Sequence, residues 1–250
     1  MSILNLFNVY IPTFKRSKEI STPYILPKGL DVYVVCPESQ VDEYKKENPD
    51  LDFLPCPDSV EGNMAKKRNW IKDNCVKDYF IMIDDDVKHF QMIEGYEQLK
   101  MNRNQIINMF EKGFQMMEDL GTVLWGINLN NDKRSYREFM PFSMLAPILG
   151  PFTAWKKDNS LRYDERFPTK EDYDMSLQVL HKYHKVLRMN KYSYYCGHLT
   201  GQEGGSHSIR TLDMELKQNI GLQKKWGDKV VKYDMEKSVN PRLYVPIKGV

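Results

Sequence analysis

Three consecutive carboxylates, Asp84, Asp85 and Asp86, directly follow an apolar run at residues 79–83. The run is short and partly β-branched, which predicts a buried strand of an α/β sheet. Acids that follow such a strand lie at the carboxyl edge of the sheet, where open α/β sheets bind ligands. Adjacent carboxylates repel one another unless a cation lies between them, and Mg²⁺ and Mn²⁺ prefer oxygen ligands. The stretch therefore predicts a divalent-metal site that also accepts substrate phosphates, although an acidic turn has the same composition.

Two basic segments are expected at the same edge of the sheet. One is the loop at residues 12–16 after the opening strand, and the other is a helix that begins at Gly62 and runs to about Cys75. Their cationic side chains are Lys15, Arg16, Lys66, Lys67 and Arg68. Ammonium and guanidinium groups pair with phosphate oxygens, so both segments are candidates for binding a diphosphate. A solvated basic loop or helix face is the alternative interpretation.

A second group of acids opens a helix that we expect at residues 170–182. Thr169 is the expected N-cap, and Glu171 and Asp172 follow it in the first turn. The helix dipole stabilises acids at this position whatever their function. A carboxylate in the same place can also take a proton from an acceptor hydroxyl, which makes this pair a candidate for general-base catalysis.

Two late histidines, His198 and His207, are candidate metal ligands because both lie beside glycines in a stretch expected to form a loop. A neutral imidazole can complete a metal shell that aspartates begin. We take His198 as the first choice and His207 as its substitute, while a lone histidine more often has no such role.

The elements that must position these residues alternate regularly in the first hundred residues. Strands are expected at residues 4–11, 31–36, 51–54 and 79–83, with helices at 38–47 and 62–75. This order predicts right-handed crossovers and a mainly parallel sheet. The later chain predicts helices at 102–120, 170–182 and 212–226, a strand at 122–129, one long strand or a strand pair at 186–196, and an extended tail after 239. Residues 139–149 are compatible with a strand followed by a loop, but their pattern does not fix the secondary structure.

The composition places few limits on the partners of this chain. Its 250 residues suffice for one large α/β domain, and 36 basic against 34 acidic residues give a formal charge of +2. This balance neither requires nor excludes a polyanion. Four cysteines without a C-x-x-C pair or zinc spacing predict a reducing, cytoplasmic setting. Neither a signal sequence nor an apolar run of membrane-spanning length is expected.

The ordered set of motifs resembles the GT-A class of nucleotide-sugar glycosyltransferases. The matching parts are residues 11–16, the Gly62-to-Asn69 helix, Asp84-Asp85-Asp86, Glu171-Asp172 and a late histidine. Within that class the chain is most similar to the small phage-type glycosyltransferases associated with TET-like DNA dioxygenases, which are linked to sugar addition on 5-hydroxymethylcytosine in DNA. The resemblance implies one GT-A (Rossmann-like) domain with a mainly parallel central sheet flanked by helices. Residues 1–100 would bind the nucleotide sugar, 101–210 the acceptor, and 211–250 would form a C-terminal helix and tail.

The resemblance also implies roles on the donor side of the site. Asp84 and Asp86 match the metal-binding D-x-D motif, with Asp86 as the more direct ligand, and Asp85 at the variable position would contact the ribose. By the same resemblance, Thr13 and Arg16 of the loop after the first strand would bind the base and ribose. Lys66 and Arg68 of the second helix would bind the donor, and His198 would bind the metal.

On the acceptor side, Asp172 matches the general base of inverting members, with Glu171 beside it. The implied reaction moves a hexosyl or pentosyl group from a nucleotide sugar, with a UDP-sugar as the expected donor and Mn²⁺ or Mg²⁺ as the ion, to a hydroxyl group. The expected acceptor is 5-hydroxymethylcytosine in phage DNA, in the host cytoplasm. Candidate DNA contacts, or otherwise solvated loop charges, are Lys133, Arg134, Arg137, Arg210 and the stacking residue Tyr136.

Other functions remain open from the residues alone. The acceptor could be a glycan or a small molecule, and the chain could instead be a nucleotidyltransferase or an inactive sugar- or nucleic-acid-binding module. A haloacid-dehalogenase-type phosphatase also places an Asp-x-Asp motif after a strand. That motif normally ends the first strand, and a Thr or Val stands two positions after its second Asp. Here three strands are expected before the motif, and Lys88 occupies the position two residues after Asp86.

Overall fold

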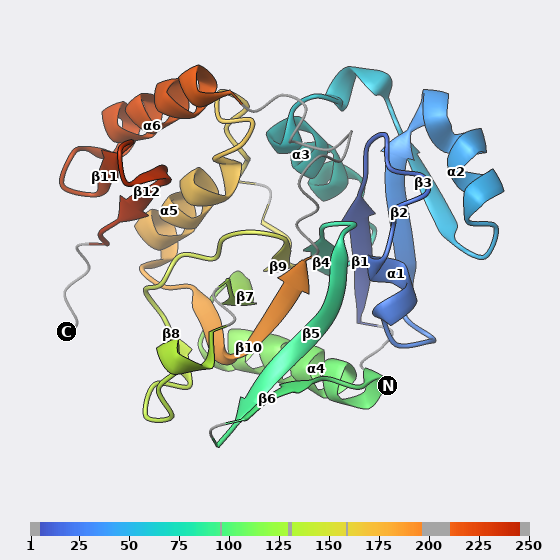
Figure 1. Cartoon of the computed structure of the whole chain (residues 1–250), viewed down its shortest axis with the longest axis horizontal. Coiled ribbons are helices and arrows are strands. Elements are labelled where there is room, and N and C mark those ends of the chain that lie inside the picture. The colour runs from blue at the N-terminus through green and yellow to red at the C-terminus, as the bar shows by residue number, and fades with distance from the viewer. Residues whose placement is uncertain (1–5, 96, 130–131, 159, 197–210, 246–250) are drawn as a thin grey trace.

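The computed structural model describes residues 6–95, 97–129, 132–158, 160–196 and 211–245. A ten-stranded sheet lies between two layers of helices, and a two-stranded sheet lies beside the C-terminal helix (Figure 1). The order of the large sheet is β3-β2-β1-β4-β9-β7-β10-β5-β6, and β8 pairs with β10. The predicted α/β class, with helices on both faces of a central sheet, is confirmed.

The bounds of the elements are as follows. The strands of the large sheet are β1 Phe7–Pro12, β2 Val32–Pro37, β3 Asp52–Cys56, β4 Tyr79–Ile83, β5 Val87–Glu94, β6 Glu97–Lys100, β7 Leu124–Asn128, β8 Phe142–Ser143, β9 Phe152–Lys156 and β10 Leu187–Cys196. The helices are α1 Thr22–Ile25, α2 Val41–Glu47, α3 Met64–Asn74, α4 Arg103–Asp119, α5 Glu171–Tyr183 and α6 Leu212–Trp226. The small sheet consists of β11 Val231–Asp234 and β12 Ser238–Leu243.

The first four strands form the parallel part of the sheet that the alternating pattern predicts. β3, β2, β1 and β4 pair in parallel, in that order. β1 is buried on both faces: Phe7, Val9 and Ile11 join one apolar cluster, and Tyr10 joins another. Because a parallel strand covered on both faces is apolar at successive positions, the continuous apolar run of β1 suits this place.

Four strands were not predicted from the sequence: β5, β6 and β9 of the large sheet, and β11 of the small one. β9 lies antiparallel between β4 and β7, and β5 pairs antiparallel with β6 and β10. β5 mixes exposed and buried positions, and β9 is a five-residue strand preceded by a proline-rich stretch. Such strands depend on partners that lie far away in the chain, and local pattern carries little of that information.

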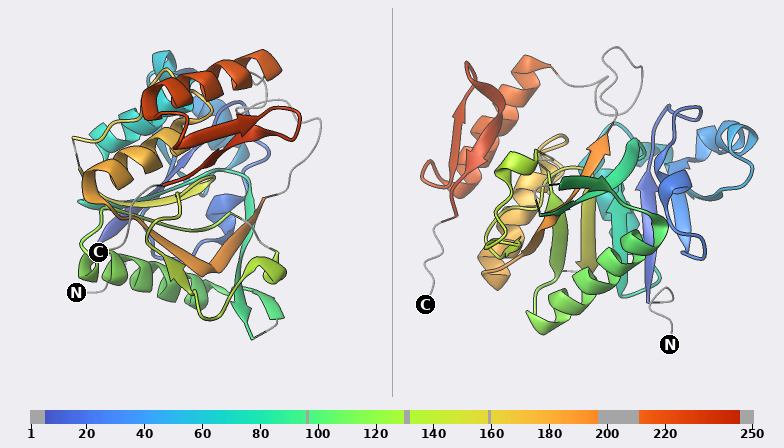
Figure 2. Two further views of the ribbon diagram at one scale, coloured as in Figure 1. Left: turned by 90° about the vertical axis from the view of Figure 1, so that its left-hand side faces the viewer. Right: turned by 60° about the horizontal axis from the view of Figure 1, so that its bottom comes forward.

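Helices cover both faces of the large sheet (Figures 1 and 2). α4 contributes to the same cluster as Val9, and α3 and α5 contribute to the cluster of Tyr10. Asn63 caps α3, since its side chain accepts hydrogen bonds from the Ala65 and Lys66 amides. Asn102 and Gln105 form a reciprocal capping box at the start of α4. No helix within the described ranges is both long and apolar enough to cross a membrane.

The C-terminal segment packs as a unit against α5. Leu222 of α6 and Val231 of β11 share a small apolar cluster with Phe167 and Leu177. Figure 2 shows α6 and the β11–β12 hairpin on the side of the molecule that carries α5. The tail that was expected to be extended forms β12 up to Leu243.

Candidate active site

A cavity of about 660 Å³ opens at the carboxyl ends of β1 and β4. Its lining comes from the loop after β1, the start of α3, the acids after β4, the turn at 149–151, the start of α5, the end of β10 and Asn240 of β12. Asp84, Asp85, Asp86 and Asp172 all line it. The structure therefore brings together the two acidic stretches that the sequence singled out, although they are far apart in the chain.

The backbone of the acidic turn is held by the segment that starts α1. Ser21 and Thr22 donate their amides to the Asp85 carbonyl, and the Thr22 hydroxyl donates to the Asp84 carbonyl. With the main chain fixed, the Asp84 and Asp86 side chains remain about one-third exposed in the cavity. Burial and the repulsion of neighbouring carboxylates raise the pKa of Asp84.

Each of these two aspartates faces an arginine. Arg68 Nη2 lies 3.3 Å from Asp84 Oδ1, and Arg16 Nη1 lies 3.6 Å from Asp86 Oδ2. Both arginines are well buried, and Arg68 Nη1 and Arg16 Nε have no hydrogen-bond partner among the described residues. The two guanidinium groups place positive charge beside the accessible acids, which favours binding of an anion in the cavity.

Asp85 differs from its two neighbours. Its carboxylate is buried, accepts a 2.5 Å hydrogen bond from the Thr13 hydroxyl and lies 3.2 Å from Arg16 Nη1. Burial raises the pKa of Asp85 to about 6, against the lowering effect of these two partners. Asp85 thus holds Thr13 and Arg16, both predicted for the donor site, at the edge of the sheet through these two contacts.

The basic helix α3 places its three consecutive cations in different surroundings. Lys67 is buried, and its ammonium donates to the Thr13 carbonyl and pairs with Glu61, both at 2.5 Å. Arg68 reaches the acidic turn, whereas Lys66 is half-buried and is not among the residues that line the cavity. Lys67 therefore supports the loop after β1, and Arg68 is the member of the three that reaches the acids.

The expected N-cap of α5 is wrong. Lys170 occupies that position without a side-chain cap, while the Thr169 hydroxyl interacts with Gln218 and Glu215 of α6. The prediction failed because a tertiary partner competes for the hydroxyl that a local cap would use.

The two acids at the start of α5 lie in different surroundings. Asp172 lines the cavity, and its carboxylate accepts hydrogen bonds from the Gly150 and Tyr173 amides at 2.9 and 2.8 Å. Glu171 is buried behind it, with Oε1 3.7 Å from Arg68 Nε, and burial raises its pKa to about 8. Of the predicted catalytic pair, Asp172 is the carboxylate that a substrate in the cavity can reach.

The donor set at the acidic turn suits a Mg²⁺ or Mn²⁺ ion that is shared with a substrate. No cluster of three or more His, Cys, Asp or Glu side chains able to hold a metal occurs within the described residues. Two accessible carboxylates, Asp84 and Asp86, are nevertheless the usual protein share for an ion that completes its shell with phosphate oxygens and water. His198 and His207, predicted as further ligands, lie outside the described residues.

Several cavity residues were missed at the sequence level. Lys170 is fully buried, and its ammonium lies 2.7 Å from Asn240 Oδ1 and 2.6 Å from Glu215 Oε2. Tyr194 and Cys196 reach the cavity from the end of β10. The tyrosine-rich composition of that strand was the available signal, but nothing local indicates which tyrosine faces the acids.

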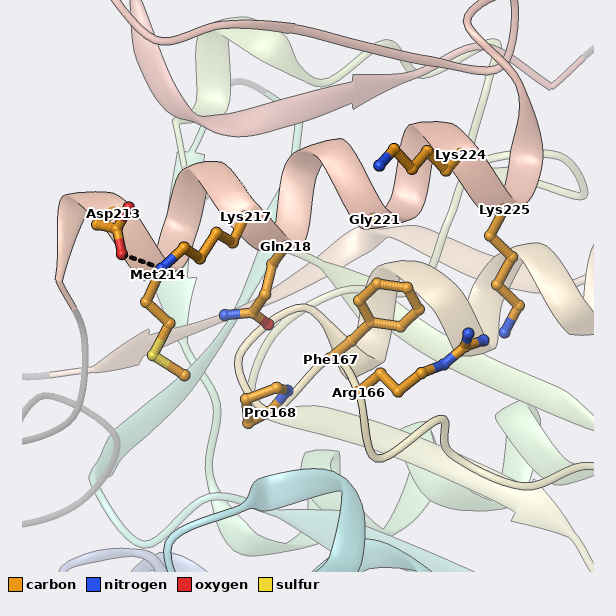
Figure 3. A pocket seen from close by; sticks show the side chains of 10 residues that line it. All are labelled: Arg166, Phe167, Pro168, Asp213, Met214, Lys217, Gln218, Gly221, Lys224 and Lys225. Atoms are coloured by element: carbon orange, nitrogen blue, oxygen red, sulfur yellow. Dashed lines mark ion pairs between the residues drawn. The ribbon is translucent and has the colours of Figure 1, made fainter.

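A second groove, of about 650 Å³, runs along α6 (Figure 3). Its cationic side chains are Arg166, Lys217, Lys224 and Lys225. Lys217 pairs with Asp213 at 2.6 Å, while Arg166 and Lys225 share Asp164 at 2.6 and 2.8 Å. Because internal pairs neutralise most of this charge, the groove has little positive charge left for an anionic partner.

The residues predicted to contact DNA lie on the long connection between β7 and β9. Arg134 pairs with Asp132 at 2.8 Å, and Arg137 donates to the Arg134 carbonyl. Phe139, which follows them, is 80% exposed. Arg210 lies outside the described residues. The connection thus combines exposed cations with an exposed aromatic ring.

Comparison with known proteins identifies both fold and family relationships. The family described as TET-associated glycosyltransferase matches residues 7–205. A mannosyltransferase from Pyrobaculum calidifontis, solved with GDP-Man and Mn²⁺, has a TM-score of 0.56 at 12% identity, over 88% of this chain and 64% of its own. Glucosyl-3-phosphoglycerate synthase from Mycobacterium tuberculosis, solved with Mn²⁺, UDP-glucose and phosphoglyceric acid, has a TM-score of 0.51 at 10% identity, over 98% of this chain and 88% of its own. No protein of curated function matches the sequence.

These likenesses confirm the predicted GT-A fold class. The chain spans less than two thirds of the length of the mannosyltransferase that it matches. The identities are low, so the likeness establishes the architecture of the sheet and helices and leaves the substrates to be argued from this cavity.

Proposed function

Because the chain belongs to the TET-associated glycosyltransferase family, we propose that it transfers a sugar from a nucleotide-sugar donor to a hydroxyl acceptor in the β1–β4 cavity. The observation that carries this proposal is the convergence of Asp84, Asp86 and Asp172 on one cavity that Arg16 also lines. One end of such a cavity suits a diphosphate and the other a reacting hydroxyl.

On the donor side, Asp84 and Asp86 would hold a Mn²⁺ or Mg²⁺ ion. When bound, such an ion neutralises the charge that develops on a diphosphate leaving group. Arg16, which lines the cavity, and Arg68, which pairs with Asp84, add further positive charge to that end of the cavity and so favour a bound diphosphate. The two structural neighbours described above were solved with Mn²⁺ and with a GDP- or UDP-sugar, which supports a donor of this chemical class.

On the acceptor side, Asp172 acts as the general base. Its carboxylate takes the proton of the acceptor hydroxyl while the hydroxyl oxygen forms a bond to the anomeric carbon, and the bond from that carbon to the diphosphate breaks. The Gly150 and Tyr173 amides fix its orientation and leave lone pairs free for the substrate. The raised pKa of Glu171 keeps it largely protonated at neutral pH, so it does not compete as a base.

We further propose 5-hydroxymethylcytosine in DNA as the acceptor, which would place the reaction in the cytoplasm of a phage-infected host. The family description, which links these enzymes to TET proteins, supports this acceptor. The exposed Arg134, Arg137 and Phe139 on the β7–β9 connection suit a nucleic-acid backbone and an unstacked base. A base must leave the duplex before chemistry at its edge can occur in a cavity.

The decisive experiment incubates the protein with Mn²⁺, a panel of UDP- and GDP-sugars, and DNA that contains 5-hydroxymethylcytosine or cytosine. Nucleosides are released by digestion and weighed by mass spectrometry. We expect one sugar to be added to the hydroxymethylated nucleoside and none to cytosine. Release of nucleoside diphosphate without a modified nucleoside would reject the DNA acceptor, and absence of turnover with every donor and with glycan and small-alcohol acceptors would reject the enzyme activity.

A further inference from the structure

Tyr194 lines the active-site cavity and has a buried hydroxyl that the fold does not use. The residue is 5% exposed and lines the cavity from the end of β10, where it lies opposite Phe90 of β5. Its Oη has no hydrogen-bond partner among the described residues. A buried hydroxyl without a partner is destabilising by about 1–3 kcal/mol, so its retention calls for an explanation.

The hydroxyl lies directly against Gly150. A methyl group built on that glycine would come within 2.3 Å of Tyr194 Oη, and the φ of +82° at Gly150 also disfavours any other residue. Gly150 is the residue whose amide holds Asp172. The Tyr194 hydroxyl is therefore next to the turn that orients the general base.

The pKa of the same hydroxyl is also affected by the acids of the donor side. Burial above all, together with the nearby carboxylates Asp84 and Asp172, raises the pKa of Tyr194 well above its usual value. The phenol stays protonated at any physiological pH and can serve as a hydrogen-bond donor. In a proposed transferase the reacting sugar must lie between the diphosphate end of the cavity and Asp172, and Tyr194 lines this cavity beside Gly150, the residue that holds Asp172.

We propose that Tyr194 Oη donates a hydrogen bond to an oxygen of the transferred sugar. This inference rests on the proposed function, because it assigns a contact within that same cavity. A neutral donor at this position recognises the sugar without adding to the charge of a cavity that already holds several carboxylates. The contact would stabilise the bound donor through its sugar and would leave the nucleotide untouched.

The test compares Tyr194→Phe with Tyr192→Phe. Tyr192 is a matched control because it lies two positions earlier on the same strand, is also buried, and is not among the cavity-lining residues. Calorimetry in Mn²⁺ measures the affinities for UDP-glucose and GDP-mannose and for UDP and GDP. We expect Tyr194→Phe to weaken binding of the accepted nucleotide sugar by about 5- to 15-fold, the effect of one lost hydrogen bond, and to leave binding of the nucleoside diphosphate unchanged.

Urea unfolding of the ligand-free proteins gives an independent readout. Since the hydroxyl has no partner within the described residues, Tyr194→Phe should be at least as stable as the wild type. A clear loss of stability, or an equal loss of affinity for nucleotide sugar and nucleoside diphosphate, would overturn the inference. Unchanged affinity of Tyr194→Phe for a nucleotide sugar that the wild type binds would also overturn it, whereas failure of the wild type to bind any of these ligands would count against the proposed function itself.

Discussion

At the scale of single residues, the site is organised by arginines that each face carboxylates of different kinds. Arg68 lies between the accessible Asp84 and the buried Glu171, at 3.3 and 3.7 Å. Arg16 lies between the buried Asp85 and the accessible Asp86. In each case a buried acid lies beside the guanidinium, and an accessible acid remains available to a ligand.

Replacing Asp172 with Asn should separate catalysis from donor binding. The amide keeps the shape of the side chain but cannot accept a proton, so the rate of sugar transfer should fall by about 10²- to 10⁴-fold. The affinity for the nucleotide sugar, measured by calorimetry, should change little because Asp172 lies on the acceptor side. A transfer rate close to that of the wild type would remove Asp172 from the role of base.

Replacing Asp86 with Ala should abolish the dependence of donor binding on metal. The wild type should bind UDP- or GDP-sugar more tightly in Mn²⁺ than in EDTA, since the ion links carboxylate and diphosphate. In Asp86→Ala the two affinities should converge. Asp58→Ala, on the exposed turn before α3, serves as the control for loss of an aspartate elsewhere. An undiminished effect of Mn²⁺ on the variant would show that Asp86 is not a ligand.

Glu171→Gln tests the raised pKa of the buried carboxyl. The folded-state pKa of about 8 lies above the ordinary value of 4.5, so the unfolded chain loses this proton first as the pH rises. The contribution of Glu171 to stability is therefore complete below about pH 4.5 and is lost as the pH rises toward 8. The free energy of unfolding of the wild type, relative to Glu171→Gln, should decrease between pH 5 and pH 8 in urea titrations. Parallel pH profiles for the two proteins would contradict the assignment.

At the scale of elements, the start of α5 is held by the C-terminal segment, which follows the part of the chain that matches the family. Thr169 contacts Glu215 and Gln218 of α6, and Lys170 bridges α6 and β12. One turn farther along α5, Asp174 accepts hydrogen bonds from Lys225 and Trp226. These contacts, rather than a local cap, hold the start of α5 and thereby position Asp172.

Lys170→Met should therefore be strongly destabilising. Removing the ammonium breaks its buried ion pair with Glu215, and breaking a buried pair from one side costs about 3–5 kcal/mol of folding free energy. The exposed pair of Lys217 and Asp213 on the same helix gives a matched control, because Lys217→Met should cost less than about 0.5 kcal/mol. Urea unfolding of both variants measures the difference. Equal, small effects would show that the C-terminal segment contributes little to holding α5.

At the scale of the whole molecule, the charge is nearly balanced, so any DNA binding must rely on a local surface. The formal net charge is only +2, and the groove along α6 is largely neutralised by internal pairs. Within the part of the chain that the structure describes, the β7–β9 connection is the candidate we favour, since its cations are exposed and lie near an exposed phenylalanine.

Arg137→Ala should weaken binding to hydroxymethylated DNA and lower its dependence on salt. If Arg137 neutralises one phosphate, the slope of log affinity against log salt concentration should fall by about one unit. Lys224→Ala, in the α6 groove, should leave that slope unchanged. Fluorescence anisotropy over a salt series measures both slopes. A larger effect of Lys224→Ala than of Arg137→Ala would move the DNA surface to α6.

The sequence by itself determined the parallel half of the sheet and the two acidic stretches. Runs such as residues 79–83 are buried on both faces, and burial of that kind leaves a continuous apolar pattern that needs no knowledge of distant partners. The predicted α3 and α4 were also found, since apolar spacing and their Asn63 and Asn102 caps are local features.

Only the tertiary structure decided which polar groups within each stretch face the cavity. Asp84, Asp85 and Asp86 are identical in type and adjacent in sequence, yet Thr13 and Arg16 bury the middle one. Tyr194 reaches the cavity because β10 lies between β5 and β7 in the sheet. Orientation at a strand end or helix start depends on partners from distant segments, because hydrogen bonds and burial there are set by packing and not by local propensity.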